Sequence, residues 1–304
     1  MQTQLIKHIS VGLLKAMKAN TERLYKDVEF LTEINPSRNY LNLDSINKVV
    51  EYIKEEFKQM GGSSIEQKWM AGKNEYSNII ASYEPLKSKR LIIGAHYDVF
   101  GDQPGADDNA SAVAGLLETA RMIFKNKPEL DYGIDFVAYC LEEPPFFGSE
   151  LMGSYVHAKS LKNDNVEVIG MICYEMIGYF SDEPNSQNFP TPELAALYPD
   201  VANFIIVVGI DQHQEFNSKV HRLMSKDSGI DVQLINFPES IGLAGLSDQR
   251  NYWTFGYPAL MINDTSFIRN PNYHEKSDTI ETLDFGKMTE VINSSYKAIV
   301  NLHD

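Results

Sequence analysis

The chain has 304 residues, of which 43% are hydrophobic, 11% aromatic and 23% charged, a composition typical of a globular protein rather than a disordered or fibrous one. Its 42 acidic residues outnumber its 27 basic residues, and the resulting formal charge of −15 disfavours binding to a nucleic-acid backbone. No apolar run approaches the roughly 18 to 20 residues that cross a bilayer, so we expect no membrane association.

The beginning of the chain lacks the basic and then apolar pattern of a secretory signal. We therefore expect a cytoplasmic protein as the sequence stands, or a secreted or periplasmic one if the sequence is trimmed. Cys140 and Cys173 each end an apolar run, which favours buried thiols over a disulfide.

The first 60 residues have helical periodicity. Leu5, Ile9, Leu13, Leu14 and Met17 predict one helix, and a second pattern from Ile46 to Phe57 ends at Gly61-Gly62, with Asp44 or Ser45 as its candidate cap.

Strands and helices then alternate along the chain. The predicted strands are Tyr76 to Tyr83, Arg90 to Ala95, Ile134 to Leu141, Val166 to Tyr174 and Phe204 to Gly209; the predicted helices are Ala110 to Lys125, Glu150 to Leu161 and Gln212 to Ser225. This alternation predicts an α/β fold of three layers, with a mixed, mainly parallel sheet and helices on both faces. We expect a single domain over residues 1–304, in which the proline-rich residues 180–200 form a loop that covers the site.

Polar residues follow the predicted strands. His96 and Asp98 end the second strand, Asp107 and Asp108 precede a helix, and Glu142-Glu143 ends the next strand. Two prolines follow Glu143, which disfavours the alternative that Glu142 and Glu143 are ordinary surface residues. For Asp107 and Asp108 the alternative is stronger, because paired aspartates before a helix often serve only as caps. Open α/β sheets place their ligands at these strand ends.

Two further residues extend this set, Glu175 at a strand end and His274 in a polar loop before the last helix. Together the residues offer imidazole nitrogens and carboxylate oxygens without a cysteine. That composition favours a hydrolytic zinc centre over a structural one, because catalytic zinc keeps a position open for water.

The ordered motifs resemble those of the co-catalytic di-zinc aminopeptidases, a family that also contains glutamate carboxypeptidase and the glutaminyl cyclases. The motifs are Gly94-Ala-His96-Tyr-Asp98, Gly105-Ala-Asp107-Asp108-Asn109-Ala-Ser111, Glu142-Glu143-Pro144 with Gly148-Ser149, Glu175-Met176-Ile177-Gly178, and Tyr273-His274 with Ser277-Asp278-Thr279. The resemblance covers about residue 77 to the C-terminus. It implies an aminopeptidase-type domain with an eight-stranded mixed sheet, and two Zn²⁺ per chain.

The resemblance also implies a role for each matched residue. His96 and Glu175 would bind one zinc, Glu143 and His274 the other, and Asp107 would bridge both, with a cis peptide between Asp107 and Asp108. Asp98 would orient His96. Glu142 would be the general base that takes a proton from the metal-bridging water and returns it to the leaving amine.

This sequence departs from the family pattern in two places. The family usually has an aspartate where this chain has Glu175, so the ion held there is expected to be shifted or more weakly bound. The family's Ser-Asp-His motif reads here as Ser247-Asp248-Gln249, which puts the contacts of that loop in doubt.

The leading interpretation is an exopeptidase that hydrolyses the N-terminal peptide bond of a peptide with a free amino terminus. Tyr179, Phe180, Arg250 and Arg269 are the candidate substrate contacts. The alternatives are a glutaminyl-cyclase-like transferase with one zinc, a carboxypeptidase, and a catalytically silent peptide-binding module. The oligomeric state, the preferred residue and the physiological metal stay open.

Overall fold

The computed structural model describes residues 18–238 and 242–302. The helix predicted around Leu5 to Met17 lies outside these residues. Within them, no helix is long and apolar enough to cross a membrane.

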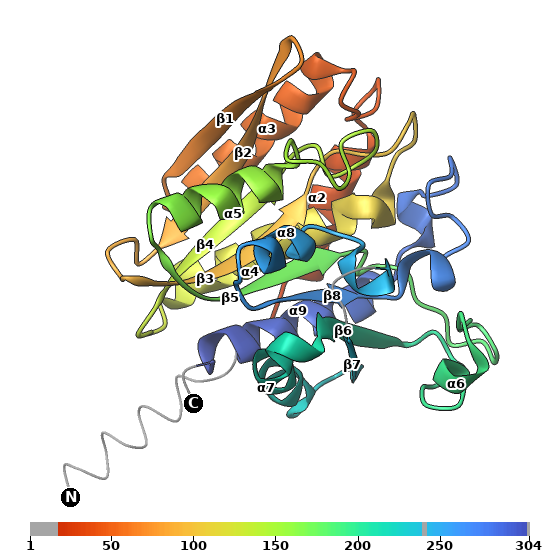
Figure 1. Cartoon of the computed structure of the whole chain (residues 1–304). Helices are drawn as coiled ribbons and strands as arrows, with labels where there is room; N and C mark the ends of the chain where they lie inside the picture. Colours follow the sequence, from red (N-terminus) through yellow and green to blue (C-terminus); the bar gives the residue numbers. More distant parts are fainter. Residues whose placement is uncertain (1–17, 239–241, 303–304) are drawn as a thin grey trace, which may run out of the picture.

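An eight-stranded mixed sheet forms the centre of the fold, as predicted, with the strand order β1-β2-β4-β3-β5-β8-β6-β7 (Figure 1). The strands are β1 Ser64–Ala71, β2 Asn74–Tyr83, β3 Lys89–His96, β4 Gly133–Tyr139, β5 Glu167–Glu175, β6 Phe204–Ile210, β7 Asp231–Phe237 and β8 Ala259–Asn263. Neighbours β4, β3, β5 and β8 run parallel, so their carboxyl ends meet at one edge. Strand β6 runs antiparallel to β8 and parallel to β7.

Helices cover both faces of the sheet. Helices α2 (Thr21–Thr32), α3 (Leu43–Gln59), α4 (Ala112–Asn126), α7 (Gln214–Ser225) and α9 (Phe285–Val300) contribute to one large apolar cluster with one face of the sheet. Helices α5 (Gly153–Asn163) and α8 (Gln249–Thr254) pack on the other face. The three-layer α/β fold is confirmed.

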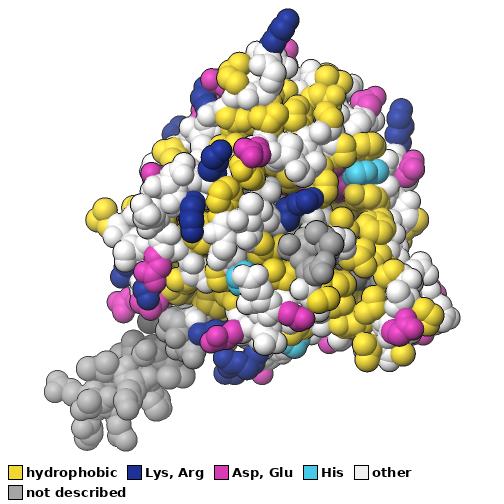
Figure 2. Space-filling view, in the orientation of Figure 1, with side chains coloured by type: hydrophobic (Ala, Val, Ile, Leu, Met, Phe, Trp, Pro, Cys, Tyr) yellow, Lys and Arg dark blue, Asp and Glu magenta, His cyan; other side chains and the backbone are white. Residues whose placement is uncertain are grey.

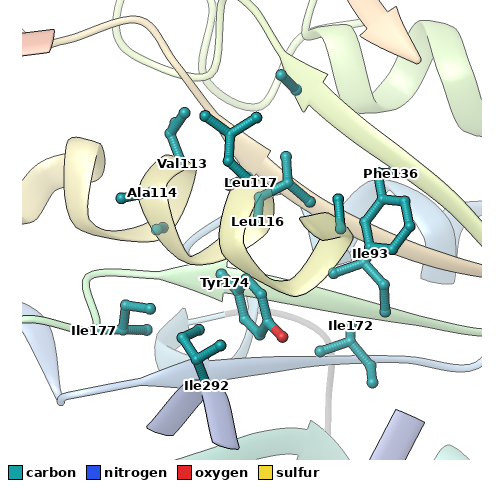
Figure 3. Packing of buried hydrophobic residues seen from close by; sticks show 14 of the residues in the cluster. Ile93, Val113, Ala114, Leu116, Leu117, Phe136, Ile172, Tyr174, Ile177 and Ile292 are labelled. Carbon is teal, nitrogen blue, oxygen red and sulfur yellow. The ribbon is translucent and has the colours of Figure 1, made fainter. Parts of the chain in front are cut away.

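The core of the larger cluster explains why the central strands are so apolar. Figure 3 shows Leu116 and Leu117 of α4 beside Ile93 of β3 and Phe136 of β4, all fully buried. Period-two alternation sends Ile92 and Val137 to the opposite face, where they join the second cluster. Both faces of these strands are therefore apolar because both are covered.

Some predicted boundaries are wrong in detail. Helix α3 begins at Leu43, before the expected caps, and the Ser45 hydroxyl instead donates to the carbonyl of Pro36. Helix α4 begins at Ala112, two residues after the predicted start at Ala110, because an irregular turn, Ala106–Ser111, precedes it. Cys140 and Cys173 are buried free thiols, as predicted.

Candidate metal centre and substrate cavity

The end of β3 supplies His96, which is 1% exposed. Its Nδ1 lies 3.2 Å from the backbone oxygen of Asp98 and 3.7 Å from the Asp98 carboxylate. That carboxylate accepts hydrogen bonds from the backbone N–H groups of Glu142 (3.2 Å) and Glu143 (3.1 Å). Asp98 therefore fixes two strand ends at once: its carbonyl faces the imidazole, and its side chain holds the turn that carries both glutamates.

The turn before α4 places Asp108, not Asp107, at the centre of the cluster. Asp108 Oδ1 lies 3.4 Å from Nε2 of His96, and Oδ2 lies 3.1 Å from Nε2 of His274. The cis peptide likewise joins Asp108 to Asn109, one bond later than expected. The structure therefore brings Asp108, and not the predicted Asp107, to the centre of the cluster.

Asp107 points away from this cluster. Its carboxylate accepts hydrogen bonds from the backbone N–H of Gly178 (2.9 Å) and from the Asn270 amide (2.7 Å). The Asp278 carboxylate accepts from the backbone N–H groups of Asp107 (2.9 Å) and Asp108 (3.1 Å). These contacts orient the turn so that adjacent aspartates project to different sides.

Glu175 and Glu143 flank the central aspartate. Glu175 Oε2 lies 3.3 Å from Nε2 of His96 and accepts a hydrogen bond of 2.6 Å from the Ser247 hydroxyl. Glu143 Oε2 lies 3.4 Å from Nε2 of His274, and its Oε1 accepts from the backbone N–H of Phe100 at 3.1 Å. The longer Glu175 side chain thus reaches the cluster and is held there by Ser247.

His274 is held between two aromatic rings. Its imidazole stacks on Phe100 with ring centroids 4.2 Å apart and on Tyr273 at 3.8 Å. The rings confine the imidazole to a plane in which Nε2 faces the carboxylates.

Three overlapping groups in this cluster have donor atoms within 4.8 Å of one another, the spacing that a shared cation requires: His96, Asp108 and Glu175; His96, Glu142 and Glu143; Asp108, Glu143 and His274. Oδ1 of Asp108 and Nε2 of His274 are buried, yet neither makes a well-formed hydrogen bond to any described residue. Buried polar atoms without a partner are costly, so a bound cation is a natural partner for them. Nitrogen and oxygen donors without sulfur suit zinc.

The pKa values of the clustered carboxyl groups also support a bound cation. Burial and the Asp108 charge raise the pKa of Glu143 to about 7, and burial with the nearby carboxylates raises the pKa of Glu142 well above its ordinary range. Burial opposes ionisation of Asp108 as well, but the neighbouring His274 and His96 imidazoles outweigh it and lower the pKa of Asp108. The cluster therefore concentrates negative charge that a divalent cation would neutralise.

A cavity of about 190 Å³ opens beside the carboxylates. Its floor is the face of the sheet that α5 and α8 leave free, because period-two alternation directs Ile206 and Val208 of β6, Ile235 and Phe237 of β7, and Met261 of β8 to the same side. Its walls come from the loop residues Phe147, Phe189, Pro190, Leu194, Tyr198, Leu243, Leu246, Phe267, Ile268 and Tyr273. Figure 2 shows hydrophobic side chains gathered on the side of the molecule that carries α6.

None of the four predicted substrate contacts lines this cavity. Arg269 is 4% exposed and donates to the backbone oxygen of Phe204 and to Gln187. The Arg250 guanidinium lies over the Phe147 ring, 4.7 Å from its centroid. The structure therefore brings neither arginine to the cavity, and the Arg269 guanidinium is already bonded to the protein.

The two aromatic candidates also lie outside the cavity. The backbone N–H of Tyr179 donates to the Asp264 carboxylate at 2.9 Å, and the Phe180 ring packs against the Arg269 guanidinium. The apolar floor that β6, β7 and β8 contribute to the cavity was not predicted from the sequence. Alternation within β6 and β8 was its only local signal, and that pattern is common to many buried strands.

Comparison with known proteins agrees with this geometry. Residues 78–298 match the sequence profile of the family described as peptidase family M28. The chain is 42% identical over 93% of its length to the uncharacterized protein YfbL of Escherichia coli (strain K12), covering 88% of that protein. It is 26% identical over 94% of its length to a probable leucine aminopeptidase of Trichophyton verrucosum (strain HKI 0517), covering 74% of it.

Solved structures share the fold at low identity. The LapA aminopeptidase of Legionella pneumophila superposes with a TM-score of 0.74 at 21% identity, covering 93% of this chain and 72% of LapA. A glutaminyl cyclase of Fimbriiglobus ruber superposes with a TM-score of 0.70 at 19% identity, covering 94% of this chain and 97% of the cyclase. The fold is thus common to hydrolases and cyclases, so the reaction has to be inferred from the residues of the site and not from the fold.

Proposed function

Because the chain belongs to peptidase family M28 and is a peptide hydrolase, we propose that it is a zinc-dependent aminopeptidase that removes large apolar residues from the amino termini of peptides. The observation that carries this proposal is the junction of a buried carboxylate and histidine cluster with an apolar cavity of about 190 Å³.

The donor set fits two zinc ions. His96 and Glu175 would hold one ion and Glu143 and His274 the other, with Asp108 contributing one carboxylate oxygen to each. The unpartnered atoms of Asp108 and His274 support this assignment. Bound zinc would lower the pKa of water and polarise the scissile carbonyl.

Glu142 is the proposed general base. Its carboxylate lines the cavity and lies 3.8 Å from Nε2 of His96, near the donor atoms of the cluster. Its place beside these donor atoms suits a group that accepts a proton from the attacking water and then delivers it to the leaving amine. Asp98 holds the Glu142 backbone, so the carboxylate is positioned before substrate arrives.

Charge favours cleavage at the amino terminus over the carboxyl terminus. Four carboxylates, those of Asp108, Glu142, Glu143 and Glu175, face the cavity and would attract an ammonium group. Among the residues that the structure describes, no lysine or arginine lines the cavity, so no such side chain is available there to pair with the terminal carboxylate of a carboxypeptidase substrate.

The apolar lining of the cavity indicates which N-terminal side chain of the substrate the enzyme would prefer. Burying a leucine or phenylalanine side chain is worth about 1.5 to 3 kcal/mol, so these residues should be preferred to alanine. The probable leucine aminopeptidase of Trichophyton verrucosum is consistent with that preference.

The test combines a substrate panel with metal analysis of the purified protein. Leucyl and phenylalanyl reporter amides should be cleaved faster than alanyl, glutamyl or lysyl ones, and N-acetyl-leucyl amide should not be cleaved. Two zinc equivalents are expected at saturation. Cleavage only from a free carboxyl end would identify a carboxypeptidase, and ammonia release from an N-terminal glutamine peptide without amide hydrolysis would identify a cyclase. No turnover with bound peptide would identify a binding module.

A further inference from the structure

The segment between β5 and β6 builds one wall of the cavity. Phe189, Pro190, Leu194 and Tyr198 of this segment line the cavity, yet its regular structure is limited to the four-residue helix α6 (Pro192–Ala195). In Figure 1 the segment with α6 projects from the body of the fold. Its conformation therefore depends on contacts with residues outside it.

Arg269 supplies several of those contacts from a buried position. Its Nε donates to Oε1 of Gln187 at 2.7 Å, and its Nη1 donates to the backbone oxygens of Phe204 (2.9 Å) and Tyr179 (3.4 Å). Tyr179 lies near the start of the segment, Gln187 lies within it, and Phe204, the first residue of β6, follows it. One guanidinium thus binds both ends and the middle of the wall.

Aromatic packing and charge keep the guanidinium in place. It lies 4.6 Å from the Phe204 ring centroid and 5.6 Å from that of Phe180. Burial lowers the pKa of Arg269 to about 10, which still leaves it charged at neutral pH. Bonds from a charged donor are stronger than neutral ones.

Gln187 connects its own segment to the loop after β8, which contributes another part of the cavity wall through Thr265. It is 5% exposed and lines the cavity, and its Nε2 donates to the Thr265 hydroxyl at 3.0 Å and to the Asn188 backbone oxygen at 2.8 Å. Its amide oxygen is occupied by Arg269. Because its hydrogen-bonding atoms already have protein partners, Gln187 is suited to fix the distance between these two parts of the wall.

We infer that Arg269 and Gln187 are positioning residues that set side-chain selectivity, by holding the 180–200 wall at the distance that accepts a large apolar residue. This inference rests on the proposed aminopeptidase function and identifies the two residues that would determine the width of its specificity pocket. Loosening the anchor should weaken the binding of bulky substrates and leave the metal centre intact, because neither residue contacts the carboxylate cluster in the structure.

Three variants and one control test this inference on the zinc-loaded enzyme. Gln187→Met keeps the side-chain length and removes both amide functions, Gln187→Glu keeps an acceptor for Arg269, and Arg269→Lys keeps the charge but loses the fork of donors. Gln59→Met, at an exposed position on α3, is the matched control.

Gln187→Met and Arg269→Lys should each raise KM for leucyl substrate about tenfold, with kcat and zinc content near wild type and the preference for leucyl over alanyl substrate reduced. Gln187→Glu should retain the preference. The double variant should lose less than the sum of the single losses, since both act through one contact. Unchanged selectivity in Arg269→Lys would overturn the inference, as would loss of zinc with KM unchanged.

Hydrogen exchange gives a readout that needs no activity. Residues 180–200 should exchange faster in Gln187→Met and Arg269→Lys, and at the wild-type rate in Gln59→Met. Equal exchange in all variants would refute the anchoring role. If wild type cleaves no aminoacyl substrate, the proposed function fails, whereas faster exchange would still establish the anchor.

Discussion

Oδ2 of Asp108 lies 3.1 Å from Nε2 of His274. The other carboxylate oxygen faces His96, on the opposite side of the cluster. One side chain therefore connects donors contributed by β3 with a donor from the loop before α9. That placement makes Asp108 the residue whose loss should disrupt metal binding most.

Asp108→Asn should abolish binding of both zinc equivalents, because an amide is a poor ligand and the residue serves both sides. Asp107→Asn is the matched control, because it makes the same change at the neighbouring aspartate, whose carboxylate points away from the cluster. We expect this variant to keep its zinc. Elemental analysis after dialysis measures both, and full zinc occupancy in Asp108→Asn would contradict the bridging role.

Glu142→Gln should reduce kcat by about 10² to 10⁴ while fold and zinc content stay unchanged, because the amide keeps the shape but cannot accept a proton. Glu150→Gln, at an exposed position, should behave as wild type. Steady-state kinetics with metal analysis on the same samples check the prediction. Wild-type kcat in Glu142→Gln would remove this residue from the mechanism.

Glu175→Asp should retain two zinc equivalents, whereas Glu175→Ala should retain one. Zinc accepts varied carboxylate approach, and His96 remains to orient the ion in the shorter variant. Titration of metal-free protein with zinc measures the stoichiometry. A single equivalent in the wild-type protein, with Glu175 needed for ammonia release, would favour the cyclase alternative.

Removal of metal should destabilise the protein most at alkaline pH. Burial raises the pKa of Asp264 to about 6, Asp248 to about 7 and Asp278 to about 8, against an ordinary value of about 4 in the unfolded chain. Between about pH 4 and pH 8 the folded metal-free protein binds more protons than the unfolded chain, so its stability falls as pH rises. Bound zinc stabilises the fold by linkage.

Thermal melts from pH 5 to pH 8.5, with and without chelator, check this prediction. The chelated protein should melt at progressively lower temperature as pH rises, and the zinc-loaded protein should change less. Asp248→Asn removes one titrating group and should flatten the slope, while the exposed Asp211→Asn should not. A melting temperature that rises with pH in the chelated protein would contradict the assignment of buried, protonated carboxyls.

The sequence by itself predicts most of the central sheet, because strands such as Leu91 to Ile93 are apolar on both faces. It predicts β2 to β6 but not β1, β7 or β8. Strands β1 and β7 are edge strands with many polar positions, and β8 has five residues. A short or half-polar segment becomes a strand only when a neighbour supplies its hydrogen bonds.

The positions of His96, Glu142, Glu143, Glu175 and His274 in the cluster also follow from the sequence. All but His274 lie at or just after the carboxyl ends of parallel strands, and such ends converge wherever the strands pair. Local strand geometry and parallel pairing therefore bring the other four side chains together, whereas the position of His274 was expected from the resemblance.

The tertiary structure alone decides between Asp107 and Asp108. These neighbours differ in role because Asp278, distant in sequence, and the backbone of Gly178 orient the turn that carries them. The tertiary structure also decides the role of Arg269. Its charge predicted a substrate contact, but the guanidinium is buried and donates to the backbone oxygens of Tyr179 and Phe204. Side chains in irregular turns take their direction from distant partners, and no local periodicity encodes those partners.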